Sequence, residues 1–249
     1  MTDTIRTAAV GDMHVPRGGH AGLQPAFNAA AASADVLVIA GDITDYGLRE
    51  EARIVASALA PVKIPVIAVL GNHDFESGHQ AEVTKILVDA GVMVLDGDAQ
   101  EVAGVGFAGV KGFAGGFGPR ALAPWGEESI KNFVHEAVNE ALKLESALAR
   151  LRTPHRVAIM HYAPILGTVQ GEPLEIYPFL GSSRLEDPLN RYPASAVFHG
   201  HAHRGSLEGR TREGSPVHNV AMPLLVQAFP GRPPIRIIEL TVALPAAVA

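Results

Sequence analysis

The sequence predicts an α/β fold in which parallel strands alternate with helices. The apolar runs Asp35–Ala40 and Ile64–Leu70 are continuous, as in parallel strands that are covered on both faces. Segments with helical patterns separate the first three strands, which indicates βαβ units. A polar cluster also follows each of these strands, at the position where open sheets of this class bind ligands.

Length and composition are those of a folded globular protein. The chain has 249 residues, of which 47% are hydrophobic and 18% charged, and we expect a single domain over 1–249. It has neither an apolar run of about 20 residues nor a leader-like start, so we expect a cytoplasmic protein without a membrane partner. The net charge of -6 argues against a nucleic-acid partner, because such partners are bound through positive charge. Nothing in the sequence predicts the oligomeric state.

Cysteine is absent, so a metal site in this chain would need His, Asn and carboxylate ligands. The first predicted strand, Ile5–Val10, runs directly into Asp12 and His14. Residues two apart in extended backbone point the same way, so these two side chains could hold one ion. A surface turn is the alternative. A helix is predicted over 25–33.

The second strand ends in Gly41–Asp45, and a helix over 48–59 leads to the third strand, which ends in Gly71–Asp74. We expect these clusters to lie with the first one at the same edge of the sheet. The alternative for each cluster is that its Asp caps the next helix. Capping would account for Asp45 or Asp74, but not for the His residues beside them.

The middle of the chain predicts a helix over 81–90 and strands over 92–95 and 102–110, near a sheet edge. The glycine-rich segment Gly109–Gly118 could bring backbone N–H groups to a phosphate, but a flexible surface loop is the commoner role of such a segment. The longest helix, 127–152, carries an apolar stripe at steps of four and three. We expect it to pack on the sheet rather than to form an oligomer contact.

Another strand, over 155–160, ends in His161. A single His at a strand end is more often a hydrogen-bonded polar residue than a metal ligand. His161 is therefore a candidate ligand only in the context of the rest of the chain. An irregular insert over 165–188 could cover a site as a lid, or it could be a plain connection.

The last strand pattern before the C-terminal region, 196–198, leads into three alternating histidines in His199–His203. In extended backbone these histidines would lie on one side, which favours metal binding. Segments 217–223 and 235–242 predict closing strands, and 243–249 predicts a frayed tail.

Five blocks of the sequence together resemble the motifs of the calcineurin-like metallophosphoesterase superfamily. In chain order they are Asp12–His14, Gly41–Asp45, Gly71–Asp74, His161 and Gly200–His203. Each block alone is a weak signal, but their order and their positions at strand ends make the set specific. The resemblance implies an α/β fold of four layers, an αββα sandwich of two mixed β-sheets flanked by helices.

The same resemblance implies two divalent metal ions, whose identity among Mn, Fe, Zn and Ni stays open because imidazole and carboxylate ligands accept all four. By similarity, the first ion would be bound by Asp12, His14, Asp42 and His203, and the second by Asp42, Asn72, His161 and His201. Asp42 would therefore bridge the ions. A hydroxide bound to the metals would attack phosphorus, with the ions about 3.5–4 Å apart.

Other roles around the site also follow from the resemblance. His73 would stabilise the phosphoryl oxygen or protonate the leaving group, and Asp45 would orient its imidazole. Asp74 is expected to cap a helix. Two groups of residues have weaker assignments by position: Arg17, Arg120 and Arg204 as phosphate contacts, and His199 and Asn219 as supports of the metal ligands.

The resemblance thus implies a metal-dependent phosphomonoesterase or phosphodiesterase acting on a small phosphorylated substrate. A nuclease of the same superfamily is one alternative, and the acidic composition argues against it. A non-catalytic scaffold with this fold is the other. Such a scaffold would be expected to lack some of the ligand positions, all of which this chain retains.

Overall fold

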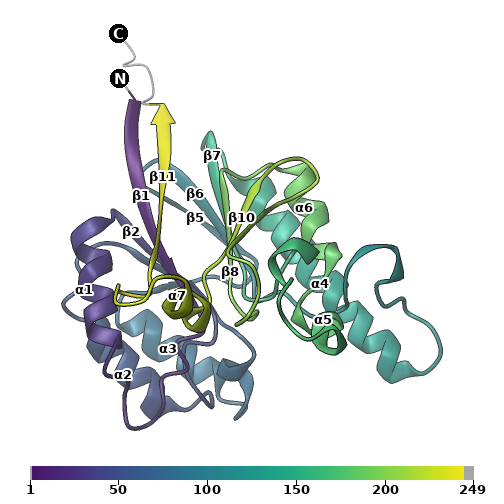
Figure 1. Cartoon of the computed structure of the whole chain (residues 1–249), viewed down its shortest axis with the longest axis horizontal. Coiled ribbons are helices and arrows are strands. Elements are labelled where there is room, and N and C mark those ends of the chain that lie inside the picture. The colour runs from purple at the N-terminus through teal and green to yellow at the C-terminus, as the bar shows by residue number, and fades with distance from the viewer. Residues whose placement is uncertain (1, 244–249) are drawn as a thin grey trace.

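In the computed structural model, which describes residues 2–243, two β-sheets lie against one another and helices cover their outer faces (Figure 1). This arrangement is the αββα sandwich that the family resemblance implied. The predicted tail lies outside the described residues beyond Ala243. Among the described residues, no helix is both long and apolar enough to cross a membrane.

The first sheet carries the parallel βαβ pattern that the sequence predicted. Its strands, in spatial order, are β11 (Arg236–Ala243), β1 (Thr2–Val10), β2 (Val36–Ala40), β3 (Val66–Val69) and β4 (Met93–Val94). β1 to β4 are parallel, whereas β11 pairs with β1 in the antiparallel sense. The sheet is therefore mixed. Its outer face is covered by α1 (Leu23–Ser33), α2 (Arg49–Leu59) and α3 (Gln80–Asp89).

The second sheet has parallel strands at its centre and an antiparallel strand at each edge. Its order is β5 (Asp98–Val102), β6 (Val105–Gly109), β7 (His155–Ile159), β8 (Ala196–His199), β10 (Pro216–Asn219) and β9 (Glu208–Arg210). Its outer face packs against α4 (Glu128–Arg150) and α6 (Glu186–Arg191). The remaining helices of the described residues are α5 (Tyr177–Leu180) and α7 (Met222–Ala228), and single 3₁₀ turns lie at His73–Phe75, Gly118–Arg120, Leu166–Thr168, Leu174–Ile176 and Ser183–Leu185.

The core between the sheets explains why the central strands are apolar throughout. Val38 and Ile67 of the first sheet belong to one buried cluster with Phe107, Ile159 and Phe198 of the second. All five residues of β2 are buried, because one face meets this cluster and the other meets the helices. The sequence-based expectation that α4 packs on a sheet is confirmed by the cluster that joins the helix to β7 and β8.

Some local structure differs from the sequence-based expectations. The strand predicted over 102–110 is present as β6 but begins later, because Ala103 and Gly104 both take positive φ and reverse the chain between β5 and β6. The predicted strand over 217–223 ends at Asn219, and a short helix follows it. The glycine-rich segment is not a surface loop, since residues 114–116 are buried.

Candidate metal centre

Polar loops that follow five parallel strands meet at one place in the structure. Those after β1, β2 and β3 come from the first sheet, and those after β7 and β8 come from the second. The carboxyl ends of parallel strands lie at a common edge, so packing the two sheets brings both sets of loops together. The resulting cluster contains all seven sequence-predicted metal ligands: Asp12, His14, Asp42, Asn72, His161, His201 and His203.

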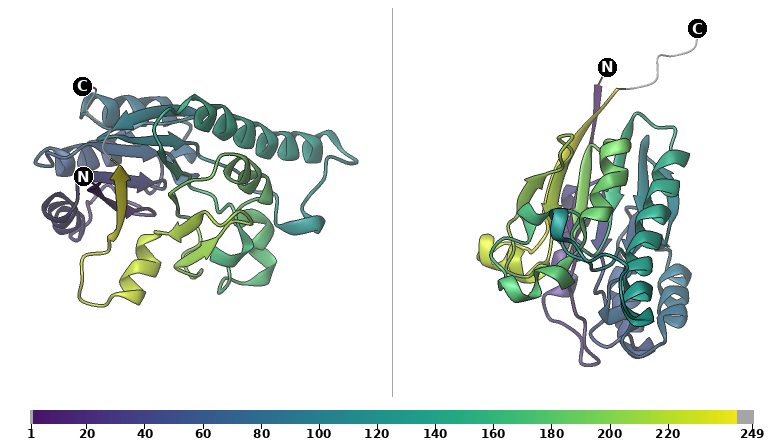
Figure 2. Two further views of the ribbon diagram at one scale, coloured as in Figure 1. Left: turned by 90° about the horizontal axis from the view of Figure 1, so that it is seen from above. Right: turned by 90° about the vertical axis from the view of Figure 1, so that its right-hand side faces the viewer.

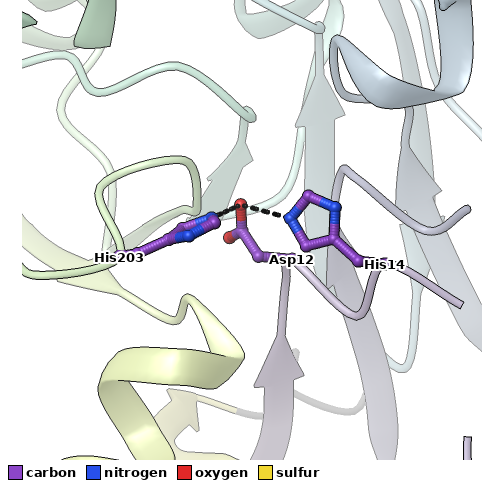
Figure 3. A group of neighbouring side chains, drawn as sticks. All are labelled: Asp12, His14 and His203. Atoms are coloured by element: carbon purple, nitrogen blue, oxygen red, sulfur yellow. Dashed lines mark hydrogen bonds and ion pairs between the residues drawn. The ribbon is translucent and has the colours of Figure 1, made fainter. Parts of the chain in front are cut away.

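Asp12, His14 and His203 form the first group of side chains, with Asp12 between the two rings (Figure 3). His203 Nε2 lies 3.0 Å from Asp12 Oδ1, and His14 Nε2 lies 4.0 Å from the same oxygen. Asp12 is buried, and the backbone N–H of His201 donates to its carboxylate. The carboxylate is thereby held facing both imidazoles.

Asp42, Asn72, His161 and His201 form the second group. His161 Nε2 lies 2.9 Å from Asn72 Oδ1, 3.1 Å from His201 Nδ1 and 3.4 Å from Asp42 Oδ2. Asp42 Oδ2 is also 3.7 Å from His14 Nε2 of the first group. Asp42 therefore lies between the two groups, as a bridging carboxylate would.

Hydrogen bonds at the far side of the rings indicate which nitrogens carry lone pairs. His161 Nδ1 lies 3.1 Å from the backbone oxygen of Ala40, and His201 Nε2 lies 3.2 Å from that of Phe179. A carbonyl oxygen only accepts, so these nitrogens carry protons, and in the neutral form of each ring the opposite nitrogen presents a lone pair to the cluster. His14 Nε2 is buried there without a hydrogen-bond partner in the described part of the chain. Lone pairs and carboxylates that converge in this way suit divalent cations.

The charges of the cluster shift the pKa values of its members. Burial alone would raise the pKa of Asp42, but the neighbouring charge and hydrogen bond of His161 outweigh burial and lower it. Burial lowers the pKa of His161, yet the Asp42 carboxylate outweighs this and raises it to about 9. Burial lowers the pKa of His201 to about 3. The neutral ring of His201 is the form that binds metals.

The sequence matches the family model for calcineurin-like phosphoesterases over residues 5–205, which includes every residue of the cluster. The chain belongs to this family. The family generally uses two divalent metal ions, and the chemistry of the cluster agrees with that use. No curated protein matches the sequence significantly.

Solved structures share the fold of this phosphoesterase at low sequence identity. Phosphopantetheinyl hydrolase from Mycobacterium tuberculosis is 18% identical with a TM-score of 0.66, and the match covers 93% of this chain and 95% of that one. A protein from Thermus thermophilus is 13% identical with a TM-score of 0.55, over 97% and 100% of the chains. A putative 5'-nucleotidase from Staphylococcus aureus is 14% identical with a TM-score of 0.53, and the match covers 87% of this chain and 48% of that one.

The backbone of the ligand loops departs from the extended form on which the sequence argument relied. Asp12, His14, Asp42 and His201 all have positive φ, between 41° and 69°. Such strained conformations are typical of functional sites. The prediction that His199, His201 and His203 lie on one side was therefore wrong for His199. This residue is buried away from the cluster, and its Nε2 lies 2.8 Å from Thr168 Oγ1.

His73 and Asp45, the predicted catalytic pair, are in contact through the main chain. His73 Nδ1 lies 2.7 Å from the backbone oxygen of Asp45, and the Asp45 carboxylate instead lies 3.9 Å from His14 Nδ1. The contact fixes the His73 ring without using the Asp45 side chain. His73 Nε2 remains as the nitrogen available to a substrate.

Asp74 is not the helix cap that the sequence suggested. Its buried carboxylate accepts hydrogen bonds from the backbone N–H groups of Ile43, Thr44 and Gly71 and from the Thr44 hydroxyl. It therefore joins the loop after β2 to the loop after β3. No local pattern could reveal this role, because its partners in the loop after β2 are about 30 residues away in the chain.

A site cavity of about 360 Å³ opens over the cluster. Its walls include Asp42, His73, His201 and His203 on one side and Glu172, Ile176 and Phe179 of the predicted insert on the other. The insert therefore forms one wall of the site, and it contains short helices rather than irregular chain throughout. Arg204 also lines this cavity, whereas Arg17 and Arg120 line two others. Asn219 supports the ligand loop by donating to the backbone oxygen of Ala202.

Proposed function

We propose that this phosphoesterase hydrolyses a small phosphorylated substrate, a phosphomonoester or phosphodiester, with the help of two divalent metal ions. The observation that carries the proposal is the position of Asp42 between two groups of His and acidic side chains that open into one cavity. Two separate structural sites would not need a shared carboxylate. Two structural neighbours, phosphopantetheinyl hydrolase and the putative 5'-nucleotidase, also support it.

The proposed ligands divide between the ions as the two groups do. One ion would be held by Asp12, His14, Asp42 and His203, and the other by Asp42, Asn72, His161 and His201. When bound, such ions acidify water and neutralise charge on a phosphoryl group. Mn, Fe, Zn and Ni all suit imidazole and carboxylate ligands.

The chain's own residues would orient the substrate and handle its protons. In the hydrolysis, an oxygen of water forms a bond to phosphorus, and the bond to the leaving oxygen breaks. His73 would donate a proton to that oxygen from Nε2 when its ring carries protons on both nitrogens, since Nδ1–H donates to the Asp45 carbonyl and the ring lines the site cavity. Arg204, at the wall of the same cavity, adds positive charge where a phosphate would enter.

The experiment that tests the proposal is a substrate panel run with the metal-stripped protein and each of Mn²⁺, Fe²⁺, Zn²⁺ and Ni²⁺. The panel contains a chromogenic phosphomonoester, a chromogenic phosphodiester and single-stranded DNA. We expect metal-dependent turnover of one of the small esters and no cleavage of DNA. Preferential cleavage of DNA would support a nuclease instead. Failure to hydrolyse any substrate with any metal would support a non-catalytic scaffold.

A further inference from the structure

A larger and mostly apolar cavity lies next to the site cavity. It has a volume of about 690 Å³, within the range of about 300–1,000 Å³ that is usual for small-molecule sites. Its walls come from the glycine-rich loop at residues 115–117, the first turns of α4 and the segment Leu174–Phe179. Arg120 contributes the one charged side chain among the described residues of its lining. We call it the apolar cavity.

Phe179 connects the two cavities. It is a lining residue of both, and its backbone oxygen lies 3.2 Å from Nε2 of His201, one of the proposed metal ligands. Ile176, from the same segment, lines the site cavity. A molecule that placed a phosphate at the metal centre could therefore extend past Phe179 into the apolar cavity.

Hydrogen bonds hold the walls of the apolar cavity together. The backbone N–H of Gly115 donates to Pro178 over 2.8 Å, and that of Gly116 donates to Gly181 over 2.8 Å. The guanidinium group of Arg184 donates a 2.9 Å hydrogen bond to the backbone oxygen of Leu122. The glycine-rich loop and the α5 segment thus form a preformed wall. The first turns of α4, which extend beyond the sheets, supply the opposite one (Figure 2).

Large apolar side chains are exposed to solvent along this cavity. Leu174 is 73% exposed, Phe179 58% and Leu166 44%, and all three belong to the lining. A single exposed apolar residue is ordinary, but a group of them around a cavity next to a polar site is typical of a ligand site. The exposed faces would be covered by an apolar ligand.

We propose that the apolar cavity binds an alkyl or acyl chain of the substrate, so that the natural substrate is an amphiphilic phosphoester. This proposal rests on the proposed function, because the metal centre would hold the phosphate end. Within residues 2–243 the lining has no acidic side chain and a single cation, so it offers little to a charged second group. Burial of each methylene contributes about 0.8 kcal/mol, so chain length becomes the measurable quantity.

The first experiment compares ester chains from methyl to octyl in two series, n-alkyl phosphates and n-alkyl p-nitrophenyl phosphodiesters, at concentrations where every ester is monomeric. We expect kcat/KM to rise with each added methylene that enters the cavity, by up to about fourfold. Hydrolysis of the short esters with no dependence on chain length would overturn the cavity proposal and leave the proposed function standing.

A variant at the cavity rim makes the test specific. Leu174→Glu places a charge in the lining, and because Leu174 is highly exposed we expect the fold and the turnover of the methyl ester to be unchanged. The chain-length dependence should be lost. Leu142→Glu is the matched control, since Leu142 is 57% exposed on α4 but is not among the lining residues. Equal chain-length dependence in the Leu174 and Leu142 variants would refute the proposal.

Binding can be measured without turnover. Calorimetric titration with octylphosphonate and methylphosphonate should show tighter binding of the octyl compound to the wild-type protein, and equal binding of the two to Leu174→Glu. This comparison decides the cavity proposal even if no ester is hydrolysed. If the wild-type protein elutes as a dimer in gel filtration and Leu174→Glu elutes as a monomer, the apolar face binds a second copy of the chain and the proposal is wrong.

Discussion

At the scale of single residues, main-chain atoms hold side chains of the site, and one of them fills a role that the sequence assigned to the Asp45 side chain. The backbone oxygen of Asp45 holds His73 Nδ1, and the backbone N–H groups of His73 and His201 donate to the carboxylates of Asp42 and Asp12. These contacts do not depend on the side chain of the residue that supplies the main-chain atom. They leave the carboxylates aligned for cations and leave His73 with one nitrogen for a substrate.

The first prediction concerns His73 and Asp45. His73→Ala should lower kcat by about 10² to 10⁴, because a positioned proton donor contributes that much, while the metal content stays the same. Asp45→Ala should lower kcat much less, since the contact with His73 uses the backbone. Steady-state kinetics with metal analysis of each variant will test this. Full activity of His73→Ala on every substrate would refute the proton-donor assignment, and an equal loss in Asp45→Ala would restore a role for that carboxylate.

At the scale of elements, the loops after neighbouring strands are fastened to one another. Gly71 and Gly200 allow this approach, because a Cβ at either position would lie 2.2 Å from a carboxylate oxygen, of Asp42 and of Asp12 respectively. Asp74 then joins the loops after β2 and β3 with its four hydrogen bonds. The proposed ligands are thus carried by loops that are hydrogen-bonded to one another at the ends of buried strands.

The second prediction is that Asp74→Ala lowers the free energy of unfolding by about 3 kcal/mol or more. The substitution would leave several buried donors of the two loops without a partner, at a cost of about 1–3 kcal/mol for each such group. Urea denaturation of the metal-free protein measures it. The control is Asp89→Ala, which removes an exposed ion pair with Lys85 and should cost less than about 1 kcal/mol. Similar losses in both variants would contradict the structural role of Asp74.

At the scale of the whole molecule, the candidate metal centre takes its side chains from both sheets. Asp12, His14, Asp42 and Asn72 follow strands of the first sheet, whereas His161, His201 and His203 follow strands of the second. Ions bound by both sets would therefore link the halves of the sandwich. An ion that binds only the folded state also stabilises that state by mass action.

The third prediction is that removing the metals lowers the thermal stability of the whole protein. Chelation should lower Tm, and an added ion at about 100 times its Kd should restore about 2.7 kcal/mol of stability at one site. Differential scanning fluorimetry with increasing Mn²⁺ or Ni²⁺ measures the shift. A paired measurement on His161→Ala, which removes a ligand from the second sheet, should show a smaller shift. A Tm that does not respond to chelator or metal would argue against ions that link the sheets.

Much of the first sheet and of the ligand set follows from local pattern in the sequence. Continuous apolar runs predicted β2 and β3, because strands buried on both faces have apolar residues at every position, and helical patterns predicted α1 to α4. The short strands β5 and β9 have exposed, polar residues, and their edge positions are defined by partners rather than by their own sequence. Pattern alone could not indicate them.

The sequence by itself determined which residue types meet at the strand ends, and the order of the five blocks determined the family. The tertiary structure decided how those residues are arranged. Asp12, Asp42 and His201 have left-handed backbone within the cluster, whereas His199 is buried against Thr168, and Asp74 accepts hydrogen bonds from a loop distant in the chain. Such contacts depend on the packing of two sheets, since each side chain's partners come from segments that local periodicity cannot relate.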